Sequence, residues 1–415
     1  MNRMFCFVLD TFSAPISRRH VSILFMLLLF CMMTVISCTH KSEYQRILKE
    51  RFQIELETLR NQYGFPGATA AYILADGTIG VVATGLADVE NNIPMTTESR
   101  ILAASIGKTF VGATVLALAL ESELSLDDTV STWLGDHPWF WRLPNHDQIT
   151  VRQLLTHTSG IDNHVEMEGF IEAFRQNRGV AAPPLSPEDM IAHVLDQQPL
   201  FMAGEGWRYS DTGYLLVGLI IEEVTGHSYY EEIERRFLAP LGLTYTTPSD
   251  DFEMDGLATG YLSPDNAFDL PQKTIVRPGV MCWNPAIEWT GGGLISNPRD
   301  LVTWAKALYE GNAMEGEYLN QLLDSVPVSD VSTGTRYGIA VAVHNDGPFG
   351  QTYGHSGWIP GYCSSLRYYP AYGIAVAFQL NTDIGIADGT SPVFEDMEKR
   401  LADVVISAVG NQWPI

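Results

Sequence analysis

The sequence predicts an α/β (α+β) fold in which an antiparallel sheet, flanked by N- and C-terminal helices, carries a helical insertion subdomain. Strand-like apolar runs lie towards both ends of the chain, and helical patterns dominate its middle. Strands from both ends of a chain most simply form one sheet, which helices then cover. A cleft between the sheet and the insertion is the expected position of a binding site.

The first elements of this fold are a helix and a hairpin. Apolar side chains recur at helical spacing over residues 42–62, and Gly64 ends the pattern. Strands are expected at Ala68–Leu74 and Ile79–Thr84, joined by an Asp-Gly turn that favours a hairpin.

The middle of the chain is expected to be helical. Helix-capping residues and helical periodicity predict helices at Ser105–Glu121, Val151–His157 after Thr150, Pro187–Asp196 after Ser186, 211–225 and 228–239. The last part returns to the sheet, with a helix at Pro298–Tyr309, strands at Tyr337–Val343, Cys363–Tyr369 and Ile374–Leu380, and a final helix at Phe394–Val409. The sheet part is therefore expected to comprise residues 42–104 and 285–410, and the helical insertion residues 105–284.

The N-terminus resembles an export signal. Basic residues precede an apolar run, Val21–Ile36, that is short for a membrane span of about 20 residues and suits a signal peptide. The run ends in Ser37-Cys38, which resembles a lipobox with Cys38 as the lipidated first residue of the mature chain. We therefore expect a lipoprotein signal peptide at residues 1–37, a hydrolase domain at residues 38–415, and an exported protein anchored by lipid to a membrane and facing the periplasm or cell surface. A plain membrane anchor or an uncleaved signal is the alternative.

Charge and cysteine content exclude some functions. The formal net charge of −24 opposes binding to nucleic acid, and no basic stripe compensates for it. No C-x-x-C or H-E-x-x-H pattern is present, so neither a metal nor a cofactor is expected. Cys282 and Cys363 could form a disulfide or remain two buried thiols, and the sequence leaves both open.

The first candidate catalytic motif is Ser105-Ile106-Gly107-Lys108. Residues three apart lie on one face of a helix, so the hydroxyl and the amine are expected to be neighbours. A serine needs an adjacent base, and a lysine serving as one near pH 7 needs a pKa about 3 units below its usual value of about 10.4. Of six lysines, only Lys108 follows a serine by three positions. The adjoining Gly-Lys-Thr is not a P-loop, because Leu102 stands where that motif requires glycine.

Two further motifs follow at wide spacing. Tyr209-Ser210-Asp211 opens a predicted helix, so an ordinary helix cap is the plain interpretation. His355-Ser356-Gly357 lies in a glycine-rich stretch that could be a turn between strands.

Together the three motifs resemble those of the serine β-lactamase and penicillin-binding-protein superfamily, for which S-x-x-K and K-T-G are signatures. The similarity is to its class C-like branch of D-Ala-D-Ala carboxypeptidases, D-aminopeptidases and esterases, where Y-x-N is the second motif and H-x-G often replaces K-T-G. It covers roughly residues 50–405. Supporting stretches lie at residues 64–71, 154–160, 209–226 and 291–300.

The resemblance implies roles for individual residues. Ser105 would be the acylated nucleophile, Lys108 its base or hydrogen-bond partner, and Tyr209 a second proton-transfer group. His355 would line the opposite wall of the cleft. The backbone N–H groups of Ser105 and Trp358 would form the oxyanion hole.

The resemblance also implies substrate contacts from Asp211, Ser356 and Gly357. Asp211 stands where the family usually has asparagine, and a frame that begins at Ser210 would make it an S-D-N variant, although the Trp-Arg-Tyr context favours the tyrosine frame. His157 and Ser159 are expected to be structural.

The expected activity is hydrolysis of esters, amides or peptides through an acyl-Ser105 intermediate, on a small-molecule or peptide substrate. The alternative is a penicillin-binding sensor lipoprotein that acylates without turnover. Because His355 is mostly neutral at pH 7, where a lysine would be charged, weak β-lactamase activity is expected unless Arg208 or Arg367 supplies the missing charge.

Overall fold

The computed structural model describes residues 18–176, 183–328 and 334–410. The chain divides into two compact units, residues 1–48 and 49–415. Helix α1 (Arg18–Tyr63) begins in the first unit and ends in the second. Residues 1–17 of the expected signal peptide lie outside the described residues, and residues 18–37 belong to α1. No helix in the described ranges has the length and apolar character needed to cross a membrane.

The second unit is built on one large antiparallel sheet, which confirms the predicted fold class. Its strands follow the order β3-β2-β1-β14-β13-β12-β11-β10-β9, so its centre combines strands from both ends of the chain. Their bounds are β1 Gly67–Ile73, β2 Ile79–Asp88, β3 Ile93–Pro94, β9 Val326–Pro327, β10 Thr335–Tyr337, β11 Ala342–Gly347, β12 Gly350–Ile359, β13 Tyr362–Tyr369 and β14 Ile374–Leu380.

Two small sheets and the helices complete the unit. The small sheets contain β4 Ile101–Leu102, β5 Thr247–Pro248 and β8 Leu294–Ser296, and β6 Ile275–Arg277 and β7 Val280–Met281. The α-helices are α2 Lys108–Leu120, α3 Ser131–Leu134, α4 Val151–Leu155, α5 Glu168–Gln176, α6 Pro187–Ile191, α7 Asp211–Thr225, α8 Tyr229–Ile233, α9 Ala239–Leu241, α10 Trp289–Gly292, α11 Pro298–Tyr309, α12 Leu319–Leu323 and α13 Val393–Gly410. The short helices are η1 Ala104–Gly107, η2 Phe140–Arg142, η3 His164–Glu166, η4 Ala192–Val194, η5 Glu234–Leu238 and η6 Pro285–Glu288.

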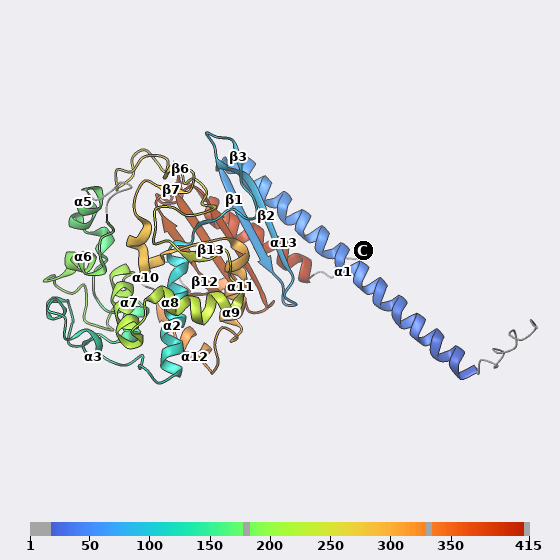
Figure 1. The fold of residues 1–415 in the computed structure, drawn as a ribbon, viewed down its shortest axis with the longest axis horizontal. Coiled ribbons are helices and arrows are strands. Elements are labelled where there is room, and N and C mark those ends of the chain that lie inside the picture. Colours follow the sequence, from blue (N-terminus) through green and yellow to red (C-terminus); the bar gives the residue numbers. More distant parts are fainter. Residues whose placement is uncertain (1–17, 177–182, 329–333, 411–415) are drawn as a thin grey trace, which may run out of the picture. The chain divides into compact units, whose positions relative to one another are not determined.

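Both faces of the sheet are covered, as alternation along its strands requires. On one face, Phe52 of α1 contacts Tyr72 of β1 with ring centroids 5.0 Å apart, and Phe394 of α13 contacts Phe378 of β14 at 5.1 Å. On the other face lies the main core, which includes Trp304 of α11. Figure 1 shows α13 on one side of the sheet and the green helices of the insertion on the other.

Most predicted elements are present, with two corrections at the sheet edge. The predicted strand Tyr337–Val343 is two strands, β10 and β11, because residues 338–341 form a turn in which Ala340 adopts φ +56°. The glycine-rich stretch around His355 is not a turn but part of β12, ten residues long. Glycine has a low strand propensity, so the residue preferences of this stretch did not predict a strand.

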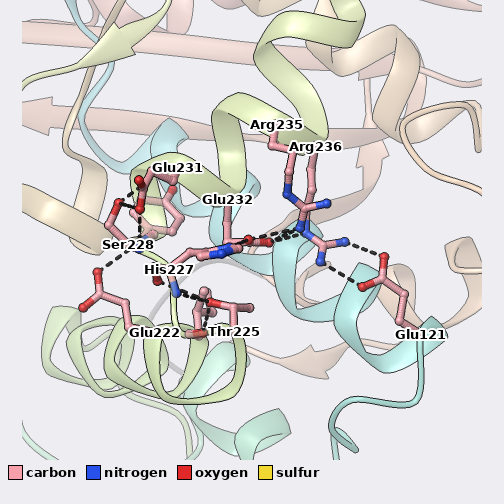
Figure 2. A network of polar contacts seen from close by, with 11 residues as sticks. Glu121, Glu222, Thr225, His227, Ser228, Glu231, Glu232, Arg235 and Arg236 are labelled. Carbon is pink, nitrogen blue, oxygen red and sulfur yellow. Dashed lines mark hydrogen bonds and ion pairs between the residues drawn. The ribbon is translucent and has the colours of Figure 1, made fainter.

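Within the insertion, an ion cluster around Glu232 joins α8 and η5 to the end of α2 (Figure 2). The Glu232 carboxylate has no exposed surface and accepts hydrogen bonds from Arg236 at 2.6 Å and Arg235 at 2.8 Å, with His227 Nδ1 2.9 Å away. Arg236 also pairs with Glu121 at 2.6 Å. Burial raises the pKa of Glu232, but these three partners outweigh it and the pKa is lowered. Glu232 is therefore ionised in the folded protein.

Cys282 and Cys363 are both buried and are not joined in a disulfide. The structure therefore favours two thiols over a disulfide between Cys282 and Cys363.

Candidate active site

Ser105 lies on a strained turn at the centre of the second unit. It belongs to the 3-10 helix η1, whereas the sequence predicted an α-helix from this residue. Ala104 before it adopts φ +49°, a conformation that typically costs about 1–3 kcal/mol in a non-glycine residue. Surrounding bonds hold the turn: Ala103 N donates to Leu294 O at 2.8 Å, and Ser364 Oγ donates to Ala103 O at 2.7 Å.

The nucleophile and its two predicted partners meet at one oxygen. Lys108 Nζ lies 3.1 Å from Ser105 Oγ, and Tyr209 OH donates to the same oxygen at 2.9 Å. Residues i and i+3 of a 3-10 helix eclipse one another, so the S-x-x-K spacing still brings the amine to the hydroxyl. Both neighbours donate to Ser105, so the resting site holds the serine oxygen in place without removing its proton.

Lys108 is charged, contrary to the lowered pKa that a resting base would need. Its side chain has no exposed surface, and Nζ lies 2.5 Å from Asp211 Oδ1. Nζ also donates to the carbonyl of Gly291. Burial lowers the pKa of Lys108, but the charge of Asp211, together with Tyr209, outweighs burial and the pKa is raised above its ordinary value.

The Tyr209-Ser210-Asp211 segment is both a helix cap and part of the site. Ser210 Oγ accepts from Gly213 N at the start of α7, so its side chain serves as the cap. Tyr209 contacts Ser105 and Asp211 pairs with Lys108, which favours the tyrosine frame of the motif. Burial raises the pKa of Tyr209 to about 12 against the lowering effect of Lys108, so the phenol is neutral.

His355 lies on β12, buried in the wall of the site. Its Nδ1 lies 2.5 Å from the carbonyl of Ser356, which can only accept, so this nitrogen carries the proton. Nε2 then accepts from Tyr337 OH at 2.7 Å. Burial, followed by the charge of Lys108, lowers the pKa of His355 to about 3. The imidazole is neutral and both nitrogens are occupied.

The remaining residues of the third motif lie beside the serine turn. A Cβ on Gly357 would lie 2.3 Å from the carbonyl of Ala103, so only glycine lets β12 approach this turn. Trp358, the next residue of β12, lines the same cavity as Ser105. The hydroxyl of Ser356, expected to contact substrate, accepts from Arg367 Nη2 at 2.7 Å.

His157 and Ser159 support the site without touching Ser105. His157 Nδ1 accepts from Ser210 N at 3.1 Å, and its ring lies 4.2 Å from that of Tyr209. Ser159 Oγ accepts from Ile161 N at 3.2 Å. Burial, then the charge of Lys108, lowers the pKa of His157 well below its usual value. His157 therefore positions Tyr209 as a neutral ring.

Ser105 opens into a cavity of about 790 Å³. Its wall is mostly apolar and aromatic, and includes Val165, Phe170, Ile171, Phe174, Trp207, Leu215, Phe268, Trp283, Ile287 and Ile359. Phe174 contacts Phe170, Phe268 and Trp283 with ring centroids 5.2–6.5 Å apart. Such a wall fits a large apolar group of a substrate.

Charged residues of the cavity are mostly paired. Arg208 pairs with Glu166 at 2.5 Å, and Arg367 pairs with Glu398 at 2.9 Å. Neither guanidinium is therefore an uncompensated charge of the kind that would replace the lysine of K-T-G. Glu288 also lines the cavity.

Two residues of the site were not found from the sequence. Tyr337 stood in a predicted strand, and Glu288 lies just before the glycine run at Gly291–Gly293 that contributed to the resemblance. Nothing in the spacing of either residue signals a role. Among the described ranges, no three histidine, cysteine, aspartate or glutamate side chains could together hold a metal ion.

Comparison with known proteins gives one consistent result. The chain is 25% identical to penicillin-binding protein 4* of Bacillus subtilis over 332 residues, covering 77% of this chain and 69% of that protein. It is 29% identical to protein flp of Staphylococcus aureus over 226 residues, but spans only 41% of that protein's length.

Two solved structures resemble the fold closely. A D-stereospecific amidohydrolase from Streptomyces sp. is 28% identical with a TM-score of 0.68, covering 83% of this chain and 97% of that one. A D-amino acid amidase from Ochrobactrum anthropi SV3, complexed with D-phenylalanine, is 25% identical with a TM-score of 0.70, covering 88% and 100%. These neighbours are hydrolases of the serine β-lactamase and transpeptidase fold. The model of the Beta-lactamase family matches residues 48–393, and this protein belongs to that family.

Proposed function

We propose that this protein is a serine hydrolase that acylates Ser105 and releases the acyl group to water. The observation that carries the proposal is the convergence of Lys108 and Tyr209 on Ser105 Oγ, at 3.1 and 2.9 Å, where that oxygen faces an apolar cavity. A serine needs a proton acceptor in order to attack a carbonyl, and a paired lysine and tyrosine can supply a proton route.

The proton route begins at Asp211. Over the 2.5 Å contact, Lys108 passes one proton to the carboxylate and becomes a neutral amine. The amine then takes the proton of Ser105 as its oxygen bonds to the substrate carbonyl carbon. The charge that appears on the carbonyl oxygen is stabilised by the backbone N–H groups of Ser105 and Trp358.

Tyr209 completes the acylation step. As the bond from carbon to the leaving group breaks, the leaving atom takes the phenol proton, and Lys108 returns a proton to Tyr209. Asp211 then gives its proton back to Lys108, which restores the resting charges. Water repeats the sequence in place of Ser105 and frees the acid.

The cavity favours amides or esters with a bulky apolar acyl group. The aromatic cluster around Phe174 would bind that group. The similarity to amidases that act on amino acid amides supports amide substrates. Anionic substrates such as penicillins lack a free positive partner here, because Arg208 and Arg367 are paired and His355 is neutral.

Labelling and turnover together test the proposal. A fluorophosphonate probe should add one adduct, on the peptide that contains Ser105, and Ser105→Ala should abolish it. The full-length protein should hydrolyse 3-phenylpropionyl p-nitrophenyl ester with a burst followed by turnover. Labelling that survives in Ser105→Ala would refute the assignment. A penicilloyl adduct that forms and is never released would instead indicate a penicillin-binding sensor.

A further inference from the structure

One carboxyl group in the catalytic cavity has no partner. Glu288 ends η6 and lines the same cavity as Ser105. Within the described part of the chain, it makes no hydrogen bond and no ion pair. Gly291, three residues along the following helical turn, accepts from Lys108. Asp211, the partner of Lys108, lines the same cavity, so Glu288 and the reacting groups face one space.

Every other charged group of the described cavity wall is compensated. Of the lining residues, Asp211 is balanced by Lys108, Glu166 by Arg208, and Arg367 by Glu398. The three histidines of the wall add no positive charge, since burial is the first cause that lowers the pKa of each: His164, to about 4, His344, and His355, to about 3. An acid is therefore the one uncompensated ionisable group of the described wall.

Glu288 is half-buried, and a carboxylate without a partner in a mostly apolar wall is stabilised when a cation reaches it. Burial, then the nearby charge of Asp211, raises the pKa of Glu288 to about 7, against the lowering effect of Lys108. A cationic ligand would stabilise the carboxylate of Glu288 and donate a charge-assisted hydrogen bond to it. The other walls of the cavity are apolar, so that ligand must carry its positive charge beside an apolar group.

We propose that Glu288 binds the protonated amino group of the substrate, which makes the substrate class amides or esters of apolar amino acids, or peptides with a free amino terminus. The assignment rests on the proposed acylation of Ser105. With the carbonyl at Ser105, the amino group lies against Glu288 and the side chain lies in the aromatic cluster of Phe170, Phe174 and Trp283. The α-carbon of an amino acid carries both an amino group and a side chain. These two groups match a cavity that has one carboxylate, Glu288, and an otherwise apolar wall.

Two substrates that differ only by the amine test this assignment. Phenylalanine p-nitroanilide, as separate D and L isomers, is compared with 3-phenylpropionyl p-nitroanilide on the full-length protein. The wild type should prefer one phenylalanine isomer over the compound that lacks the amine. Glu288→Gln should raise KM for that isomer about tenfold to a hundredfold, the range of a charged hydrogen bond, and leave 3-phenylpropionyl turnover within about twofold.

Matched variants and pH profiles distinguish binding of the amine by Glu288 from a purely structural role of this residue. Glu288→Asp keeps the charge and should recover part of the preference, whereas Glu172→Gln, on exposed α5, makes the same change in net charge and should have no effect. The groups that face Glu288 electrostatically are Asp211, Lys108 and Tyr230. KM for the amine substrate should fall as pH rises through about 7 and rise again as its own amine loses its proton near about 8. Glu288→Gln should remove the first change alone.

The outcomes are distinct. If Glu288→Gln lowers the turnover of both substrates equally, or of neither, Glu288 does not bind an amine and the inference is wrong, while acylation of Ser105 stands. If the wild type cleaves neither anilide and no probe labels Ser105, the proposed function fails and the amine assignment fails with it.

Discussion

The ion pair between Lys108 and Asp211 can be broken without a change of shape by Asp211→Asn. Removing one partner of a buried pair leaves a charge without compensation and destabilises a fold by about 3–5 kcal/mol. The side chain of Lys108 has no exposed surface, but that of Asp211 retains 19%. We therefore expect a loss near the lower end, about 3 kcal/mol at pH 7, or roughly 4 °C in Tm for a unit of this size.

The pH dependence of this loss follows from the pKa of Lys108. In the wild type that pKa is raised, so the stabilisation is fully present below the unfolded value of about 10.4 and is lost only as pH rises through the folded value. In the variant, the charge of Asp211 no longer opposes burial, so we expect the folded pKa of Lys108 to fall below that of the unfolded chain. The unfolded chain then binds more protons, so the stability of the variant rises with pH. The deficit should be largest near pH 6 and smallest near pH 10.

The same substitution alters catalysis, because asparagine cannot accept the proton that Asp211 takes. A neutral Lys108 would then act directly, so kcat/KM on an ester without an amino group should rise with pH through the lowered pKa of Lys108. The wild type should be level between pH 6 and 9, since Tyr209 titrates above this range and His355 below it.

Thermal melts and pH-rate profiles of the two proteins measure both effects, with exposed Asp147→Asn as the control for charge. If the wild type and Asp211→Asn are equally stable at every pH, or if kcat/KM of Asp211→Asn does not change with pH, the charged pair is refuted.

Four further results are expected. Tyr209→Phe should lower kcat about 10²–10⁴-fold with the fold intact. Adding Lys108→Ala to it should lower kcat little further, which kinetics of the single and double variants measure. Glu232→Gln should destabilise the protein by about 3 kcal/mol at pH 7 and by less near pH 4. A carboxyl with a lowered folded pKa loses its stabilising contribution as pH falls, and thermal melts at both pH values test this. Cys38→Ser should lose the lipid mass and detergent partitioning, and unchanged partitioning would contradict lipidation. His355→Lys should increase acylation by benzylpenicillin more than it increases ester turnover. If the wild type instead hydrolyses benzylpenicillin with kcat/KM near 10⁴ M⁻¹s⁻¹ and has no esterase activity, a neutral His355 does not disfavour anionic substrates.

The sequence predicted the sheet and its covering helices well where local signals agreed with tertiary structure. Helix α11 and strand β14 have the predicted bounds, because strong periodicity and a capping residue define them locally. Strand β12 was missed, since Gly357 is there for close approach to the serine turn and not for strand preference. That approach is a tertiary requirement, invisible in a local window.

The chemistry of the site was predictable in its members but not in its charges. The spacing of Ser105, Lys108 and Tyr209 could be interpreted from the motifs, and the structure brings all three together. The charge of Lys108 could not be predicted from the motifs, because it depends on Asp211. That residue is 103 positions away in the sequence, and only the fold brings its carboxylate to 2.5 Å from the amine. Glu288 was missed for the same reason: a carboxyl is informative only when its neighbours show it to be unpaired.

Asp211 also explains how the site can select by charge. An asparagine would leave Lys108 as a free cation in the cavity, able to attract anionic substrates. Aspartate compensates that cation, while burial, followed by the charge of Lys108, keeps His355 neutral. Glu288 then remains as the uncompensated group of the described wall. We therefore expect this one departure from the Y-x-N motif to favour neutral and cationic substrates over anions, and Asp211→Asn to shift the preference back towards anions.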